Sequence, residues 1–375
     1  MKEGWIKAKL DEICDINYGT RVVQKKDGGT IYPVYGGGGA TFRMDKYNRE
    51  DCLIVSRFAM SSLCVRFVKG KFFLNDSGLT IESKSKKVKQ DFLDKQILAL
   101  NDKIYSLGKG VAQKNLDIKE LKQVVLSYPS STSEQERIVS ELDCLSEIIE
   151  KQKQQLKELD NLAQSIFYTT FGDPISNNFG WKNRRLGEIV NSNMIGLTRS
   201  GSEQDASYEY LYFKMNNIGN EGGVDWSKTT RVNACAQEVE KYTLKEGDFL
   251  FNTRNSFELV GKTCIYPHID GEVCLFNNNI MRIDFKKEIN VTYMAYLFQD
   301  KYIKNQLDRI KKGTTSVWAI YYKDLEKIDI LVPDIALQEE FASKVAAIEK
   351  QKVTIKQSIE ETETLFNSRM DYYFN

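Results

Sequence analysis

The sequence predicts an α/β fold that is built twice: two duplicated domains of short strands and helices, separated by two long helices that form an antiparallel coiled coil. Three observations support this prediction. A central stretch has the apolar spacing of a long helix, a second such stretch lies near the end of the chain, and the segments before them begin and end with similar residues. A repeat with a period near half the chain is stronger evidence than any single motif.

The first long helix is expected at residues 133–172. Ser133 followed by Glu136 predicts a capping box at its start, and Gly172 followed by Pro174 predicts its end. Its apolar positions alternate four and three residues apart, which is a heptad pattern. These positions are Ile138, Leu142, Leu145, Ile149, Leu156 and Leu159. Such a helix is roughly 55 Å long, and a rod of that length with one apolar stripe needs a partner.

The second long helix is expected at residues 335–375 and is the natural partner of the first. Both helices contain the string Glu-Lys-Gln-Lys, at residues 150–153 and 349–352. Because a whole domain lies between them, an antiparallel pairing is the easiest to connect; a parallel pairing, or two helices packed separately on their own domains, stays open. Gln152 and Lys352 interrupt the apolar stripes near the helix midpoints, so antiparallel pairing would place both in one polar layer that fixes the register. The coiled-coil residues expected in this helix are Val345, Ile348, Ile355 and Ile359.

The two domains are expected at residues 1–132 and 173–334. Both begin with the motif Trp-x4-Leu-x-Glu-Ile, at residues 5–13 and 181–189. Both end with a Lys-Gly pair, an apolar run that closes on Pro, and a Gln-Glu pair at the start of the long helix. Between these ends, short runs of β-branched and aromatic residues alternate with Gly and Asn turns, which indicates mixed strands and helices without fixing their topology.

The bulk composition indicates a folded protein with reduced thiols. Of 375 residues, 41% are apolar, and the 7 cysteines include no Cys-x-x-Cys pair. Scattered cysteines of this kind are typical of a reducing compartment. No apolar run approaches the ~18 residues that a membrane span requires, and the first residues have no apolar signal segment. A cytoplasmic location without a membrane partner is therefore expected.

The residue inventory argues against catalysis by this chain. The Gly run at residues 35–40 lacks the Lys-Ser/Thr of a phosphate loop, and the sequence has neither a dinucleotide fingerprint nor the Asn/Asp-Pro-Pro-aromatic tetrad of adenine methylation. The single histidine, His268, lies in a turn-like stretch, so a Ser-His-Asp triad or a His/Cys zinc site is not expected. We therefore expect a binding protein with no catalytic residue, metal or cofactor of its own.

The charge is divided unevenly along the chain. The net charge is +1, yet residues 134–170 hold 4 basic and 8 acidic residues, and residues 339–373 hold 5 basic and 7 acidic ones. The helices are therefore acidic and the domains mildly basic. This charge distribution is compatible with binding nucleic acid, because a phosphate contact needs local Lys or Arg rather than a high overall charge.

The candidate binding residues lie in polar, Gly-rich stretches that follow predicted strands. Residues 252–256 read Asn-Thr-Arg-Asn-Ser, and Arg and Asn side chains pair well with guanine and adenine edges. The Lys-Gly pairs at residues 109–110 and 312–313 suit phosphate contacts. An ordinary turn explains any one of these stretches equally well, but their recurrence in both domains favours binding. The expected DNA-contacting residues are Arg21, Ser56, Arg57, Lys109, Arg199, Asn252, Arg254, Asn255, Lys262, Lys312, Thr314 and Thr315.

The order domain, helix, domain, helix resembles the specificity (S) subunits of Type I restriction–modification systems over essentially the whole chain. The resemblance rests on the Trp-x4-Leu-x-Glu-Ile openings, on the Pro and Gln-Glu before each helix, and on the string SIFYTTFGDP at residues 165–174. The strings IYPVYGGGGATF and LFNTRNSFELVGKT are also similar to segments of the target-recognition domains of this family.

The resemblance implies a function for both parts of the chain. The two target-recognition domains would bind double-stranded DNA, the helices would dock two methyltransferase (M) subunits, and restriction (R) subunits would join the complex. S-adenosylmethionine, ATP and Mg²⁺ would be bound by those partners, so this chain would direct DNA methylation and defence against foreign DNA without catalysing either. Because the domains carry different loops, we expect an asymmetric two-part target, with an unread gap of at most roughly 16 base pairs.

Alternatives of other classes stay open on the sequence alone. The chain would keep its role in DNA recognition if it served a system whose methylase and nuclease are fused into one protein. A coiled-coil scaffold that joins two protein-binding modules would have the same helices without binding DNA. A stand-alone nuclease or methyltransferase is disfavoured by the missing motifs.

Overall fold

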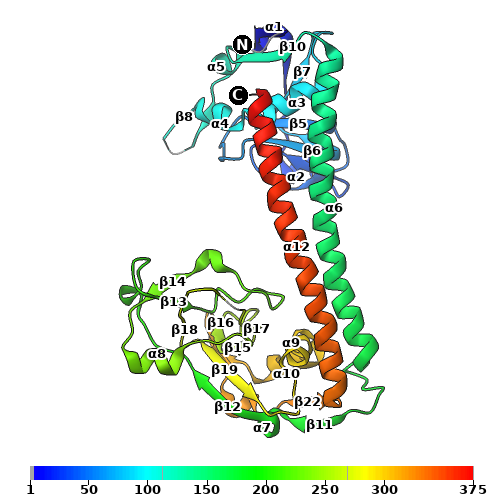
Figure 1. Cartoon of the computed structure of the whole chain (residues 1–375). Helices are drawn as coiled ribbons and strands as arrows, with labels where there is room; N and C mark the ends of the chain where they lie inside the picture. Colours follow the sequence, from blue (N-terminus) through cyan, green and yellow to red (C-terminus); the bar gives the residue numbers. More distant parts are fainter. Residues whose placement is uncertain (1–3, 112, 268, 375) are drawn as a thin grey trace. The chain divides into compact units, whose positions relative to one another are not determined.

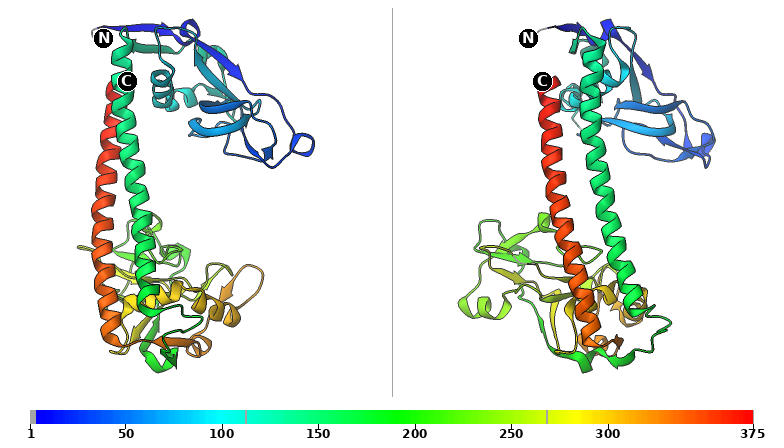
Figure 2. Two further views of the ribbon diagram at one scale, coloured as in Figure 1. Left: turned by 90° about the vertical axis from the view of Figure 1, so that its right-hand side faces the viewer. Right: turned by 45° about the vertical axis from the view of Figure 1, so that its right-hand side comes forward.

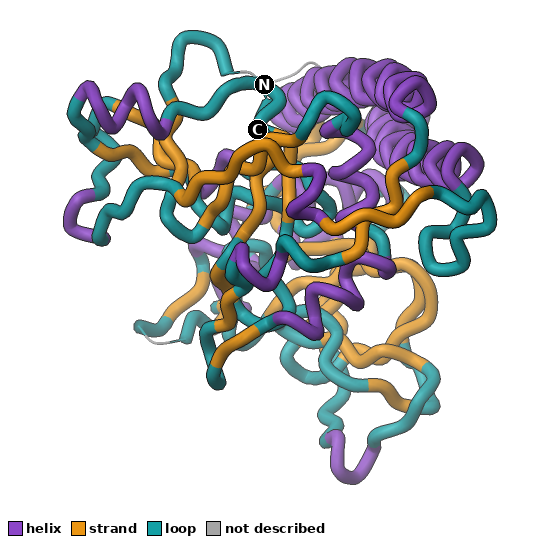
Figure 3. The backbone as a smooth tube through the Cα atoms, turned by 90° about the horizontal axis from the view of Figure 1, so that it is seen from below, coloured by secondary structure: helices purple, strands orange, loops and turns teal. Residues whose placement is uncertain are grey.

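The computed structural model describes residues 4–111, 113–267 and 269–374. The chain forms two compact units, one from Met1–Gln154 with Ile355–Asn375 and the other from Gln155–Thr354 (Figure 1). Each unit holds one α/β domain and about one half of each long helix. Apart from those two helices, the helical segments are short and lie among strands and loops (Figure 3).

The first unit is built on a six-stranded sheet with the order β2-β7-β5-β6-β3-β4. Only β3 runs parallel to its neighbour β6; the other pairs are antiparallel. Side chains alternate across the sheet, so Leu53 and Val55 face the main core, whereas Ile54 faces a smaller cluster with Phe72 and Leu74. The strands are β2 (Cys14–Tyr18), β3 (Tyr32–Tyr35), β4 (Arg43–Met44), β5 (Arg49–Ser56), β6 (Val65–Leu74) and β7 (Gly78–Ser83).

Short helices and two strand pairs complete the first unit. Strands β1 (Trp5–Lys9) and β10 (Val125–Pro129) pair antiparallel, as do β8 (Gly108–Lys109) and β9 (Asn115–Leu116). The helices are α1 (Leu10–Ile13), α2 (Gln24–Asp27), α3 (Gln90–Ala99), α4 (Asn101–Ser106) and α5 (Ile118–Lys122). The core of this unit includes residues of both long helices: Ile138, Leu142, Met370, Tyr373 and Phe374. The domain therefore packs on the helix pair through one continuous core.

The second unit has a four-stranded antiparallel sheet with the order β12-β19-β15-β17. These strands are β12 (Val190–Ile195), β15 (Phe249–Asn252), β17 (Thr263–Ile265) and β19 (Ile280–Phe285). One face packs on α9 (Val291–Gln299) and α10 (Lys301–Ile310), with Phe249 and Phe251 in that core. The other face, at Leu250, packs in a cluster with β13 (Tyr210–Phe213) and β18 (Cys274–Phe276), which form a separate sheet with β14 (Thr230–Val232).

Several of the remaining elements of the second unit repeat those of the first, whereas α8 and β16 do not. Strands β11 (Lys182–Arg185) and β22 (Asp329–Val332) pair antiparallel like β1 and β10. A small sheet with the order β16-β21-β20 takes the place of β8 and β9; its strands are β16 (Arg254–Asn255), β20 (Lys312–Gly313) and β21 (Trp318–Ala319). The short helices are α7 (Leu186–Ile189), α8 (Ala236–Tyr242) and α11 (Tyr322–Leu325).

The long helices are α6 (Thr132–Phe171) and α12 (Ile335–Phe374), which lie side by side in Figure 2. They run antiparallel in both units: Tyr373 donates to Glu141 over 2.7 Å in the first, and Lys352 pairs with Asp160 over 2.7 Å in the second. The predicted fold class is thereby confirmed. Of the expected coiled-coil residues, Ile138, Leu142, Ile149, Val345, Ile348 and Ile359 are buried, whereas Leu145, Leu156, Leu159 and Ile355 are half-buried.

Two expectations about the helices are wrong in detail. The start of α6 is capped by Ser131, whose hydroxyl accepts from the amide of Glu134 at 3.4 Å, so Ser133 is not the capping residue. Gln152 donates to Ser358 over 2.7 Å, whereas Lys352 pairs with Asp160 and Glu349. The two polar residues therefore have different partners, each within its own unit. At the other end of α6, Gly172 has a φ of +75°, as its predicted capping role requires.

None of the helices in the described residues has an apolar stretch long enough to cross a membrane.

Candidate nucleic-acid interface

The small sheet β16-β21-β20 brings together predicted binding residues that lie about sixty positions apart. Arg254 and Lys312 are both paired with Ala319 of the central strand, and Asn255 and Gly313 are both paired with Trp318. Thr314 and Thr315 follow in the exposed turn. A Cβ at Gly313 would lie 2.4 Å from the carbonyl oxygen of Val317, so this turn requires glycine.

Arg254 is the residue of this sheet that is most available to a ligand. Its side chain is exposed, and within the described part of the chain its guanidinium has no hydrogen-bond or ion-pair partner. Its backbone is held, because its carbonyl accepts from the Asn252 amide group over 2.9 Å. Asn255 is half-buried and donates to Asn252 over 3.0 Å. A free guanidinium on a fixed backbone has the geometry for bidentate pairing with a base edge or a phosphate.

An aromatic pair that the sequence analysis missed lies beside these residues. Phe257 is 39% exposed, and its ring packs edge-on against Trp318 with a centroid distance of 5.0 Å. Below it, the ammonium of Lys311 lies 4.3 Å from the ring centroid and donates to the Phe257 carbonyl over 2.6 Å. We call Arg254, Phe257, Lys312, Thr314, Thr315 and Trp318 the second loop cluster. The only signal in the sequence was the presence of these two aromatic residues, and sequence alone does not distinguish exposed aromatic residues from those of the core.

The first unit has a different cluster at the corresponding strand end. Arg57 follows β5, and its guanidinium lies 4.8 Å from the ring centroid of Tyr18 and 4.5 Å from that of Phe58. Both rings are exposed, by 46% and 38%. The segment is joined to β9, because the amide of Leu116 donates to the Arg57 carbonyl over 2.8 Å. We call Tyr18, Arg57, Phe58 and Lys109 the first loop cluster.

The Gly-rich loop of residues 36–39 packs on this first loop cluster. The carbonyl of Gly37 accepts from Ser56 over 2.7 Å and from Arg66 over 3.0 Å. A Cβ at Gly37 would lie 2.3 Å from the carbonyl oxygen of Phe58, so the close approach requires glycine. The loop is thus fixed at its base, while Gly38 and Gly39 have open space around them.

The side chains of three of the predicted contact residues are bonded within the domains, and burial argues against a direct DNA contact for two of them, Ser56 and Asn252. Ser56 and Asn252 are fully buried at the ends of β5 and β15, and their side chains hold the neighbouring loops through hydrogen bonds. Arg199 is largely buried and pairs with Glu238 over 2.7 Å. The sequence does not indicate the burial of Ser56 and Asn252, because a polar residue at a strand end can face either the interior or the solvent.

The lysines predicted to contact DNA differ in their exposure and in their bonding partners. Lys262 is half-buried, donates to the carbonyl of Ile218, and has a pKa lowered by burial and by nearby Lys228. Lys109 and Lys312 are exposed, and each pairs with a carboxylate over 2.6 Å, Asp117 in the first unit and Asp324 in the second. The hydrogen bond from each lysine lowers the pKa of its carboxylate partner. Arg21 is exposed in the loop after β2.

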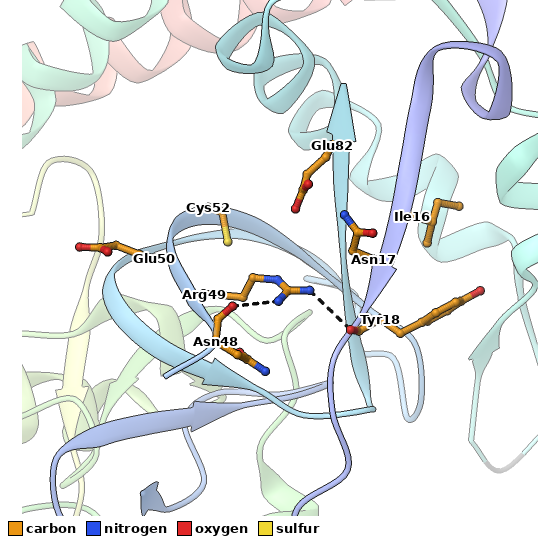
Figure 4. A pocket seen from close by; sticks show the side chains of 8 residues that line it. All are labelled: Ile16, Asn17, Tyr18, Asn48, Arg49, Glu50, Cys52 and Glu82. Carbon is orange, nitrogen blue, oxygen red and sulfur yellow. Dashed lines mark hydrogen bonds between the residues drawn. The ribbon is translucent and has the colours of Figure 1, made fainter. Parts of the chain in front are cut away.

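The first unit also has an open groove of about 680 Å³ beside Tyr18 (Figure 4). Arg49 crosses it and donates to the carbonyls of Asn48 over 2.8 Å and of Tyr18 over 3.4 Å, as the dashed lines show. Glu50 and Glu82 line the same groove, so its charge is mixed and does not favour an anion. Among the described residues, no three Cys, Asp, Glu or His side chains form a group that could hold a metal ion. His268 lies outside the described residues.

Comparison with known proteins gives a family for this architecture. The family described as the Type I restriction modification DNA specificity domain matches residues 2–161 and again residues 178–363. The two matches cover most of the chain and confirm the duplication.

A curated relative is the putative type I restriction enzyme MjaX specificity subunit of Methanocaldococcus jannaschii, which is 28% identical over 182 residues. The match covers 48% of this chain and 42% of the relative, so it spans less than half of that protein.

Two solved structures share the fold over nearly the whole chain. The S subunit of a Type I restriction-modification system from M. genitalium superposes with a TM-score of 0.60 at 18% identity, covering 98% of this chain and 95% of its own. A chain from a study of complex assembly and conformational transition of the type I R-M system gives a TM-score of 0.56 at 17% identity, covering 100% and 98%. Together with the twofold family match, this architecture assigns the chain to the family of Type I restriction–modification DNA specificity subunits.

Proposed function

We propose that this chain is the DNA-recognition subunit of a Type I restriction–modification complex and that it reads an asymmetric two-part site. The observation that carries the proposal is that the two domains share one frame but present different loop clusters. The frame is the pairing of β1 with β10 and of β11 with β22, followed in each case by a long helix. A common frame with two different binding ends fits one protein that reads two different half-sites.

The chemistry of the two clusters supports different readers. In the first loop cluster, the guanidinium of Arg57 lies against the Tyr18 and Phe58 rings. A planar guanidinium can stack on a ring and still donate hydrogen bonds to a base or a phosphate. In the second, Arg254 is free and lies on the same small sheet as Trp318 and an exposed threonine turn. Arg side chains are well suited to guanine, whereas the threonines and Lys312 suit phosphates. Ser56 and Asn252 would act by holding these loops, whereas Arg199 would hold the segment around Asn233 and Glu238.

The long helices are the proposed docking surface for two methyltransferase subunits, with restriction subunits joining that core. Their outward faces carry exposed apolar side chains among acidic ones, such as Ile148, Leu162 and Leu365. Exposed apolar residues in a charged surrounding are typical of protein interfaces. S-adenosylmethionine, ATP and Mg²⁺ would be bound by these partner subunits, and this chain, in the cytoplasm, would select where DNA is methylated or cleaved.

The test is to co-express the chain with its cognate methyltransferase and to map methyladenine across the host genome. The proposal expects one motif with two unlike parts separated by a fixed unread gap. A symmetric motif, or a motif with a single part, would contradict two distinct readers. Methylation without this chain present would contradict its role in selecting the site.

A further inference from the structure

A buried glutamine lies at the same place at the start of each long helix. Gln135 is the fourth residue of α6 and is fully buried. Its side-chain oxygen accepts from the amide of Lys89 over 2.9 Å, and its side-chain nitrogen donates to the carbonyls of Lys87 over 2.8 Å and Pro129 over 2.9 Å. The single side chain thereby joins the helix to the strand that leads into it and to the start of α3.

Gln338 makes the same set of bonds in the second unit. It is the fourth residue of α12 and is also fully buried. Its oxygen accepts from the amide of Asn290 over 2.8 Å, and its nitrogen donates to the carbonyls of Glu288 over 3.2 Å and Pro333 over 2.8 Å. Asn290 precedes α9 as Lys89 precedes α3, so the partners are equivalent elements.

Only glutamine satisfies this arrangement. The side chain uses one acceptor and two donors toward backbone groups, and its bonds to the carbonyls of Pro129 and Pro333 are buried, so leaving those carbonyls unpaired is costly. Glutamate lacks the donors, and methionine lacks both donors and acceptor. The bonds converge on three elements that meet at each helix start, so they restrain the direction in which the helix leaves the domain.

We propose that Gln135 and Gln338 are positioning residues that set how each recognition domain is held on its long helix, and thereby how strictly the gap between the half-sites is fixed. This inference rests on the proposed function. It assigns the two residues to spacing and not to base reading, because neither reaches the loop clusters: their bonds go to α3, α9 and the strands that precede the helices.

The experiment uses the full chain in complex with its methyltransferase and a set of DNA duplexes whose gap is one base pair shorter, equal or one base pair longer. The variants are Gln135→Met and Gln338→Met. Matched controls are Gln96→Met, at a buried glutamine that bonds the Ser127 carbonyl over 2.7 Å within the first domain, and Gln306→Met, at a half-buried glutamine that bonds the Asp329 backbone in the second. Gln135→Met and Gln338→Met are each expected to reduce the discrimination between gap lengths about tenfold, whereas the recognised half-site sequences stay the same.

The controls are expected to lower stability while the gap stays strict, which separates positioning from stability alone. If both Gln135→Met and Gln338→Met still require one fixed gap, the inference is overturned. A wild-type protein that recognises no two-part motif would instead overturn the proposed function. Should a methionine variant fail to fold, Gln135→Glu keeps the acceptor and loses the donors. In that variant, faster hydrogen exchange at the first turn of α6 together with relaxed gap selection is expected; faster exchange with an unchanged gap would also count against the inference.

Discussion

The two units have the same strand frame but differ in what covers one face of the central sheet. In the second unit, Arg282 on β19 is covered: it lies 5.5 Å from the Phe276 ring centroid and bonds the Thr243 carbonyl over 3.0 Å. By strand register the matching residue of the first unit is Thr80 on β7, which receives a hydrogen bond from Arg49 at the open groove. The difference lies between β12 and β15, a segment that is longer than the one between β2 and β5 and that contains α8; its strand β13 pairs parallel with β18, as β3 pairs with β6 in the first unit.

This comparison separates two kinds of residue. At the helix ends, where Gln135 and Gln338 lie, the two units repeat each other bond for bond. At the two loop clusters the units differ in the length of the loops, in their aromatic residues and in the contacts of the arginine: Arg57 lies against two rings, whereas the Arg254 guanidinium has no partner among the described residues. We infer that the starts of the long helices have the same role in both units, whereas the two loop clusters recognise different DNA sequences.

The largest expected effect comes from the core where the second unit packs on its helix segments. Phe341 is fully buried, and its ring packs against Phe167, Phe171 and Tyr296 at centroid distances of 5.7, 5.3 and 5.1 Å. Phe341→Ala is expected to reduce the free energy of unfolding by about 3–5 kcal/mol. Chemical denaturation measures this, with exposed Leu365→Ala on the same helix as the control. Equal losses for the two variants would argue against this packing.

The arginines of the two loop clusters test whether the units read separately. Arg254→Ala is expected to cost about 1–3 kcal/mol in binding the second domain's half-site and to relax the sequence preference there alone. Arg57→Ala is expected to do the same for the other half-site. Binding of duplexes with single base changes measures both. A loss of equal size on every DNA sequence would identify the residue as a phosphate contact.

The ion pairs of the first unit predict a pH dependence. The hydrogen bond from Arg369, supported by that from Tyr373, holds the pKa of Glu141 below its ordinary value. Because the pKa is lowered on folding, Glu141 stabilises the folded protein above its unfolded pKa of about 4.3, and this contribution is lost as the pH falls through the folded value. Glu141→Gln should lower Tm at pH 7, and much less at a pH below the folded pKa of Glu141. A difference in Tm that is independent of pH would contradict this assignment.

The smallest expected effect concerns the polar interruption of the helix pair in the first unit. Gln152 bonds Ser358, but its side-chain oxygen is buried without a partner among the described residues. Replacing both, as Gln152→Leu with Ser358→Ala, is expected to raise the free energy of unfolding by up to roughly 1 kcal/mol. Thermal unfolding measures this, and relaxed gap selection in the same variant would show that the polar pair also sets the register. A lower Tm would mean that the hydrogen bond outweighs the unpaired oxygen.

The sequence was sufficient for the long helices because their apolar spacing is local and continuous. It also revealed the Gln-Glu repeat, but not its role, since the partners of Gln135 lie more than forty positions upstream and at Pro129. The convergence of Arg254 with the 312–319 hairpin depends on strand pairing over a long distance, which no local pattern encodes. The burial of Asn252 could not be predicted, because a polar side chain at the end of a strand can point either into the domain or toward the solvent.

The central claim, two independent readers on a common frame, is tested most directly by exchanging one of them. Residues 1–130 would be replaced by the matching segment of a related specificity subunit that has a different target, and methyladenine would be mapped in cells that also express the methyltransferase. The account predicts that one half-site changes to that of the donor, while the other half-site and the gap are unchanged. A change in both half-sites, or in neither, would contradict it.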